Sequence, residues 1–179
     1  ELDGIVGRFL FEESTDTLWV NMDQRQLRIF RVCPKLDDTW TEVPIRINLS
    51  GLVFVTLDLA GWGQEEFVFD TGFNGGILLK ENPRLATNSD WESRGQVAQT
   101  ANGFVTDTLC KIKRDLTWDK ISIKDQDVHY YNKTVKVENL IGMEFIENYN
   151  FVIDYKEERM FLQKRKKQEA YRDRKSIRV

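Results

Sequence analysis

The stretch that decides the fold is Phe67-Val68-Phe69-Asp70-Thr71-Gly72-Phe73-Asn74-Gly75-Gly76-Ile77-Leu78-Leu79. Its two ends are apolar and β-prone, which predicts two strands joined by a glycine-rich loop. Asp70 directly follows the first strand, so its carboxylate is expected at a tight turn that leaves a buried strand. Gly72 tolerates backbone angles that other residues resist, and Thr71 offers a hydroxyl donor. The stretch therefore predicts a carboxylate held in a fixed orientation.

The remainder of the chain is also mainly strand in character. Alternating or β-branched segments predict further strands over residues 52–59, 96–100, 104–113, 120–130 and 134–141. Asn102-Gly103 lies between two of these segments and is a strong hairpin signal. Helical periodicity is short, and helices are expected only over 143–148 and 8–13. We therefore expect a mainly β fold with one or two short helices.

Length and composition limit the possible functions. The 179 residues, 41% hydrophobic and 31% charged, are enough for a domain with its own core. A single histidine and two cysteines exclude multi-histidine and multi-cysteine metal sites. Taken as a whole, the sequence implies no metal and no organic cofactor. The net charge of -3 gives no general basic excess that would suggest nucleic-acid binding, and the longest apolar runs are too short to span a membrane.

An internal repeat relates the two ends of the chain. Leu140-Ile141-Gly142 resembles Ile5-Val6-Gly7, and each is followed by a short helical segment and a hairpin pattern. Matching the two glycines gives an offset of 135 residues, whereas matching Asp23 with Asp154 gives 131. The first copy would then carry four extra residues between its helix and its hairpin.

The repeat predicts how the chain is organised. Residues 1–33 are interpreted as the C-terminal tail of a preceding lobe, and residues 40–163 as a complete lobe. Residues 164–179 hold eight Lys or Arg against two acidic residues, a local charge of +6, and are interpreted as a basic tail or linker. The first residue is Glu and the start is not signal-like, which favours a fragment or a processed chain.

Asp70-Thr71-Gly72 after an apolar strand, with Leu140-Ile141-Gly142 leading into a short helix, resembles the retropepsin-like aspartic peptidases. The resemblance covers residues 43–163 and implies a closed β-barrel lobe. It implies that Asp70 is a catalytic carboxylate, with Thr71 and Gly72 supporting its loop. It also implies that the strand ending in Gly142 passes beside that loop.

The same resemblance suggests which residues meet the substrate. It implies that the hairpin tip, Ala101-Asn102-Gly103, forms a flap over the substrate, and that Phe73, Ile141 and Gly142 are candidates for the substrate pocket. The family usually has Ala or Ser after Asp-Thr-Gly, where this chain has Phe73. This ring is expected either to crowd the carboxylate or to point into the pocket.

The implied activity is endopeptidase hydrolysis of extended polypeptides by two carboxylates about 3 Å apart that share one proton. This chain has one Asp-Thr-Gly, so the second aspartate is expected from a preceding lobe or from a second copy in a homodimer. The alternative is a catalytically degenerate lobe that acts as a peptide-binding or dimerisation module. The expected partners are thus a polypeptide and another lobe, without nucleic acid or a membrane span. As a whole the chain resembles bacterial two-lobed relatives of the retroviral enzyme, of which it would hold the complete second lobe. The sequence does not fix the compartment, and a bacterial periplasmic or secreted location is slightly favoured over a cytoplasmic one.

Overall fold

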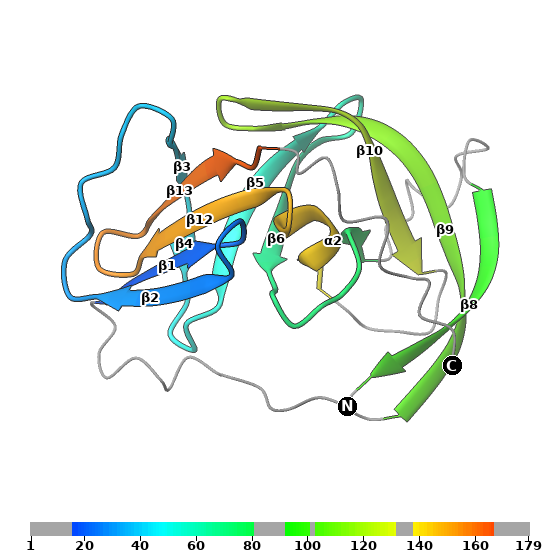
Figure 1. Cartoon of the computed structure of the whole chain (residues 1–179). Coiled ribbons are helices and arrows are strands. Elements are labelled where there is room, and N and C mark those ends of the chain that lie inside the picture. Colours follow the sequence, from blue (N-terminus) through cyan, green and yellow to red (C-terminus); the bar gives the residue numbers. More distant parts are fainter. Residues whose placement is uncertain (1–15, 81–91, 101–102, 132–137, 167–179) are drawn as a thin grey trace, which may run out of the picture.

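A computed structural model describes residues 16–80, 92–100, 103–131 and 138–166 of the chain, and strands dominate it (Figure 1). The strands are β1 (Thr17–Asn21), β2 (Gln26–Phe30), β3 (Thr41–Pro44), β4 (Arg46–Ile47), β5 (Val53–Leu59), β6 (Gly63–Phe69), β7 (Ile77–Leu79), β8 (Glu92–Thr100), β9 (Gly103–Trp118), β10 (Ile121–Tyr131), β11 (Leu140–Ile141), β12 (Tyr149–Asp154) and β13 (Arg159–Lys164). Within the described ranges there is one helix, α2 (Met143–Ile146). The mainly β prediction is confirmed, and the helix expected over 8–13 lies outside these ranges.

Six strands close into a barrel. The order β5-β6-β11-β7-β10-β9 is hydrogen-bonded along one sheet, and β9 pairs again with β5 through Asp58–Thr117 and Leu59–Leu116. β4 and β8 extend the sheet outside this ring. A closed barrel leaves no free edge in the ring itself, so every ring strand is paired on both sides. The predicted closed β-barrel is confirmed.

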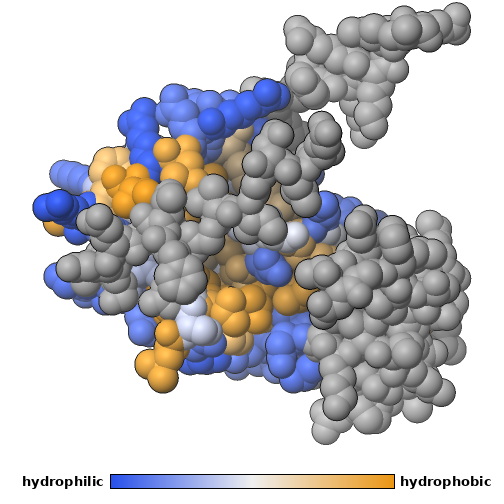
Figure 2. All heavy atoms as spheres, turned by 90° about the horizontal axis from the view of Figure 1, so that it is seen from below, coloured by the Kyte–Doolittle hydropathy of each residue, from blue (hydrophilic) through white to orange (hydrophobic). Residues whose placement is uncertain are grey.

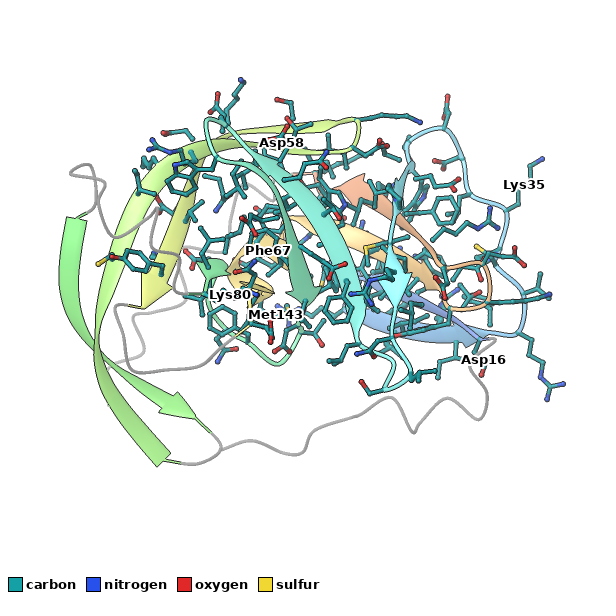
Figure 3. The ribbon with its side chains drawn as sticks, turned by 180° about the vertical axis from the view of Figure 1, so that it is seen from behind. Asp16, Lys35, Asp58, Phe67, Lys80 and Met143 are labelled. Carbon is teal, nitrogen blue, oxygen red and sulfur yellow. The ribbon has the colours of Figure 1, made fainter. Side chains whose placement is uncertain are left out.

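The barrel interior is apolar because its strands alternate. In β5 the residues at 53, 55, 57 and 59 are buried while the residues between them are more exposed. They pack with fully buried aromatic side chains from β6, β9 and α2, namely Phe67, Trp118 and Phe145. In Figure 3 Phe67 lies among the interior side chains, whereas Asp58 lies near one end of the barrel. Each large apolar side chain buried in this way contributes about 1.5–3 kcal/mol to folding.

The strand β11 lies between β6 and β7, which are joined to each other by the 70–76 loop. Ile141 of β11 pairs in parallel with Phe69 of β6 and antiparallel with Ile77 of β7. The sequence predicted a longer strand over 134–141, but in its described part only two residues are paired. β11 therefore passes directly beside the loop that begins at Asp70.

A second, five-stranded sheet has the order β2-β1-β12-β13-β3. β12 is its central strand, and all six of its residues are buried. Phe151 of β12 meets Phe69 of β6 edge-on, with ring centroids 5.3 Å apart. This contact joins the five-stranded sheet to the barrel next to the end of β6.

The hairpins β1–β2 and β12–β13 have the same local structure. Each has a four-residue turn, and Asn21 and Asp154 each accept, through Oδ1, the N–H three residues further on, at 2.9 and 3.2 Å. The last turn residue is left-handed in both, with φ of 53° at Arg25 and 48° at Glu158. These matches relate the hairpins by 133 positions. The alignment of Asp23 with Asp154 is therefore wrong by two residues, because the turn geometry equates Asn21 with Asp154. The assignment of residues 1–33 to a preceding lobe stays a prediction.

Candidate functional site

The candidate site is the 70–76 loop, where β6 ends. The N–H of Asp70 donates to the carbonyl of Ile141 at 2.9 Å, which continues the pairing of β6 with β11 beyond the strand. The N–H of Gly72 donates to Oδ1 of Asp70 at 2.8 Å, and the N–H of Phe73 donates to the Asp70 carbonyl at 3.3 Å. These bonds fix the backbone of Asp70 and one of its two carboxylate oxygens.

The other side of the loop is bonded to the segment that follows β11. The N–H of Gly142 donates to the carbonyl of Gly76 at 2.8 Å, and the N–H of Met143 donates to the carbonyl of Phe73 at 2.7 Å. Met143 is the first residue of α2, and its position is labelled in Figure 3. The loop is thus held by β11 at its start and by the beginning of α2 at its centre and end.

Two glycines allow this close approach. A Cβ atom on Gly142 would lie under 3.0 Å from the carbonyl oxygens of Phe73 and Gly75, a separation that real Cβ atoms essentially never show. A Cβ atom on Gly75 would run into the ring of Phe73 in the same way. The Phe73 ring therefore lies against the backbone of its own loop and of Gly142. The expectation that the ring either crowds the carboxylate or points into the pocket stays a prediction.

The Asp70 carboxylate is held but accessible. Asp70 is half-buried, while Thr71 and Gly72 are exposed. Gly72 holds the carboxylate through its backbone N–H, as the sequence predicted for this turn. A carboxylate with one oxygen fixed and the group open to water can accept a proton from a water molecule or, when protonated, donate one. The catalytic role of Asp70 and the supporting roles of Thr71 and Gly72 remain predictions.

The three pocket candidates differ in what they expose. Phe73 is partly buried, whereas Ile141 is fully buried and belongs to the barrel core. Gly142 is also buried. The backbone carbonyl of Ile141 accepts the N–H of Asp70, whereas its side chain belongs to the barrel core. The assignment of the three residues to a substrate pocket stays a prediction.

The predicted hairpin around Asn102-Gly103 is confirmed as a pairing of strands. β8 and β9 are antiparallel, and Thr100 lies opposite Gly103 at the tip. Ala101 and Asn102 lie outside the described residues. In Figure 1 the hairpin bends away from the barrel, toward the end of the molecule at which the 70–76 loop lies. Its role as a flap stays a prediction.

Asn139 is a buried polar residue directly before β11, and its role was not predicted from the sequence. Its side-chain amide donates to the Glu66 carbonyl of β6 at 2.9 Å, and its Oδ1 accepts the N–H of Lys80 after β7 at 2.8 Å. Its own carbonyl accepts the N–H of Val68 at 2.8 Å. Asn139 therefore ties together the two strands between which β11 passes. A polar residue followed by Leu-Ile-Gly was the only local signal for this role.

The described part of the chain gives three further results. Within it, no group of three or more His, Cys, Asp or Glu side chains is arranged to hold a metal ion. No helix in the same part has both the length and the apolar character needed to cross a membrane. Cys33 and Cys110 do not form a disulfide, and burial raises the pKa of the Cys33 thiol.

Comparison with solved structures agrees with this architecture. The crystal structure of a retropepsin-like aspartic protease from Rickettsia conorii is similar to the chain, with a TM-score of 0.51 and 21% sequence identity. The match covers 69% of this chain and 90% of that one. No protein-family model and no curated protein sequence matches the chain. The fold is therefore retropepsin-like, as the sequence resemblance implied, and at this identity the likeness concerns the fold alone.

Proposed function

We propose that this chain supplies one half of an aspartic endopeptidase, with Asp70 as one of its two catalytic carboxylates. The observation that carries the proposal is that this carboxylate is held in place by a hydrogen bond while the residue stays partly exposed. Oδ1 is held by the Gly72 N–H at 2.8 Å, and the residue is half-buried at the point where β6 meets β11. The retropepsin-like fold supports the proposal, because a solved structure with a similar fold is described as an aspartic protease.

Hydrolysis by an aspartate pair needs two carboxyl groups with different protonation. Two carboxylates about 3 Å apart cannot both be ionised, so they share one proton. The ionised group takes a proton from water, and the protonated group polarises the carbonyl of the scissile bond. The water oxygen then bonds to the carbonyl carbon, and the C–N bond breaks as the amine nitrogen gains a proton. The pair titrates as a unit, so the relevant pKa values belong to both groups together.

The chain contains one Asp-Thr-Gly, so the proposal requires a second carboxylate from outside it. A preceding lobe of the same polypeptide or a second copy of the chain could supply it. In both cases the second aspartate would lie opposite Asp70 across a twofold axis. The 70–76 loop supports this arrangement because Thr71 and Gly72 are exposed beside the carboxylate.

The proposed substrate is a polypeptide in an extended conformation. An extended peptide can bind by main-chain hydrogen bonds to strand edges, with pockets for alternate side chains. β8 is the outermost strand of its sheet and turns into β9 at the proposed flap. The substrate would lie between this hairpin and the 70–76 loop, with Phe73 next to one of its side chains.

The test is cleavage of a mixed peptide library by the complete polypeptide encoded by the gene. Replacing Asp70 with Asn should lower cleavage by about 10²- to 10⁴-fold, because the amide can neither take the proton from water nor share one. Asp58→Asn is the matched control, since Asp58 is an exposed aspartate on β5 at the other end of the barrel from Met143 (Figure 3). The control should cleave at the wild-type rate over the whole pH range.

Two outcomes would count against the proposal. Cleavage that survives Asp70→Asn would rule out the aspartate mechanism. No cleavage at any pH by the complete, folded polypeptide would support the alternative, a degenerate lobe that binds peptides or mediates dimerisation.

A further inference from the structure

A pocket of about 460 Å³ lies between the barrel and the five-stranded sheet. One wall is the beginning of β10, and the other is formed by residues of β3, β12 and β13. In Figure 1 the turn between β9 and β10 lies above β3 and β13. The volume is in the range of small-molecule sites in proteins. The described residues that line the pocket belong neither to the 70–76 loop nor to β11, so it is separate from the candidate site.

Strand register brings four of the lining residues to one face of the five-stranded sheet. Tyr149 of β12 lies directly opposite Lys164 of β13. Leu162, two residues before Lys164, lies opposite Thr41 of β3. Residues two apart on a strand, and residues directly opposite on neighbouring strands, share one face. Leu162 is also opposite Phe151, which packs in the barrel core, so this face is the one turned toward the barrel.

The inner part of the pocket is apolar. Ile121 and Ile123 of β10 are partly buried and pack against the barrel core, and Leu162 is fully buried. The ring of Tyr149 belongs to the same part and contacts the ring of Phe145 in α2, with centroids 5.7 Å apart. These side chains offer an apolar surface to the hydrocarbon part of a ligand.

The hydroxyl of Tyr149 is a polar group on a side chain that is otherwise buried. The residue is 7% exposed, and among the described residues its hydroxyl has no hydrogen-bond partner. Burial raises the pKa of Tyr149, so the hydroxyl keeps its proton at neutral pH and is available as a donor. A donor that lacks a partner in a buried setting costs free energy, so a ligand that brings an acceptor to it gains affinity.

The charge of the pocket is positive. Two of the described residues that line it are lysines, and none of them is acidic. Nζ of Lys124 is already paired with Asp115 at 2.8 Å, whereas Lys164 has no ion pair with any residue that the structure describes. Lys164 and Tyr149, directly opposite one another, therefore offer an ammonium group and a hydroxyl group to the same anion. A carboxylate can accept hydrogen bonds from both.

We propose that this pocket binds a small carboxylate with an apolar body, at a site distinct from the proposed peptidase site. The carboxylate lies between Nζ of Lys164 and the Tyr149 hydroxyl, with Thr41 beside it. The apolar body lies against Leu162 and the two isoleucines of β10. A cation of the same size and shape would be repelled by Lys164, and an anion without an apolar body would leave the inner part of the pocket uncovered.

Calorimetric titration of the complete encoded polypeptide with octanoate tests the inference. Octanoate has both the carboxylate and the apolar body, acetate has the carboxylate alone, and octylamine has the same body with the opposite charge. We expect saturable binding of octanoate with a Kd of about 1 mM or below, and binding at least about 10-fold weaker for the other two. No saturable binding of octanoate up to about 10 mM, or equal binding of octylamine, would overturn the inference.

Two substitutions locate the site. Lys164→Met removes the charge and keeps an apolar stem, and Tyr149→Phe removes only the hydroxyl. Each should weaken octanoate binding by about 10-fold, because each removes a hydrogen bond to a charged group. Lys35→Met is the matched control, since Lys35 is an exposed lysine between β2 and β3 that points away from the molecule in Figure 3. The control should bind octanoate as the wild type does, and an equal loss in it would overturn the inference.

The same variants distinguish the pocket from other apolar surfaces. Figure 2 shows the molecule from below, the side opposite the β9–β10 turn, where hydrophobic side chains also reach the surface among hydrophilic ones. Octanoate bound there would not respond to Lys164→Met or to Tyr149→Phe, so unchanged affinity in both variants would overturn the inference. Asp70→Asn should bind octanoate with wild-type affinity, because Asp70 does not line the pocket. A failure of the peptidase proposal would therefore leave this result unchanged.

Discussion

At the scale of single residues, the site depends on the absence of a side chain at Gly142. In Gly142→Ala the new methyl group would press against the carbonyl oxygens of Phe73 and Gly75, which are main-chain atoms and cannot turn aside. We expect the free energy of unfolding to fall by about 1–3 kcal/mol, the usual cost of forcing atoms into a packed region. Urea denaturation followed by tryptophan fluorescence measures this loss.

Gly76→Ala is the matched control for that experiment. A Cβ atom at position 76 would meet only the Glu144 side chain, at 3.4 Å or more. Its effect should stay within about 0.5 kcal/mol. Equal losses of unfolding free energy in the two variants would contradict this prediction. They would show that the short distances at Gly142 are not the reason why an added methyl group destabilises the fold.

Residue-scale prediction from the sequence succeeded where the signal was local. Asp70 and Gly72 lie two positions apart, and the hydrogen bond between them follows from the turn that their order predicts. The burial of Ile141 and the need for glycine at 142 could not be foreseen in this way. Both depend on a loop about 70 positions earlier in the chain, whose distance from Gly142 only the folded structure defines.

At the scale of elements, the side chain of Asn139 links β6 to the end of β7, the two strands on either side of β11. Asn139→Ala would leave the Glu66 carbonyl and the Lys80 N–H without the bonds they now make to its side chain. We expect a loss of roughly 1–3 kcal/mol of unfolding free energy, because two main-chain groups would lose the bonds that they make to a buried side chain. Asn74→Ala, at an exposed position of the 70–76 loop, is the control and should change the stability little. A loss in Asn74→Ala as large as that in Asn139→Ala would contradict this role.

The elements themselves were predicted best where their pattern is regular. The alternation of residues 52–59 gave β5 to within one residue, and Asn102-Gly103 marked the turn between β8 and β9. β11 was predicted too long, because its two residues are fixed by strands on both sides rather than by their own pattern. The pairing of β5 with β9 that closes the barrel could likewise not be predicted from local sequence patterns, because it joins segments far apart in the sequence.

At the scale of the whole molecule, a polar cluster joins the β1–β2 turn to β12 and to the residue that follows β13. Nε of Arg165 donates to Oδ1 of Asp23 at 2.8 Å, and the side-chain amide of Asn150 donates to Oδ2 at 2.9 Å. Oδ1 of Asn150 also accepts the N–H of Met22 at 2.8 Å. Partial burial raises the pKa of the Asp23 carboxyl, but the bonds from Arg165 and Asn150 outweigh it, and the net pKa lies below its ordinary value. The ionised form is thus favoured by folding.

The cluster predicts a pH-dependent contribution to stability. A carboxyl whose folded pKa is lowered stabilises the fold above its unfolded pKa of about 3.9, and this stability is lost as the pH falls through the folded value. Asp23→Ala should therefore lower the free energy of unfolding by roughly 1–2 kcal/mol at pH 7, since the carboxylate is 30% exposed and partly screened. The difference from wild type should shrink as the pH falls below about 4, because the carboxyl gains its proton first in the unfolded chain. It should disappear once the pH is below the lower pKa of the folded state, where both states are protonated. Asp38→Ala, at an exposed aspartate between β2 and β3, should cause little change at either pH. A difference for Asp23→Ala that persists unchanged in acid would mean that the side chain acts through packing and not through its charge.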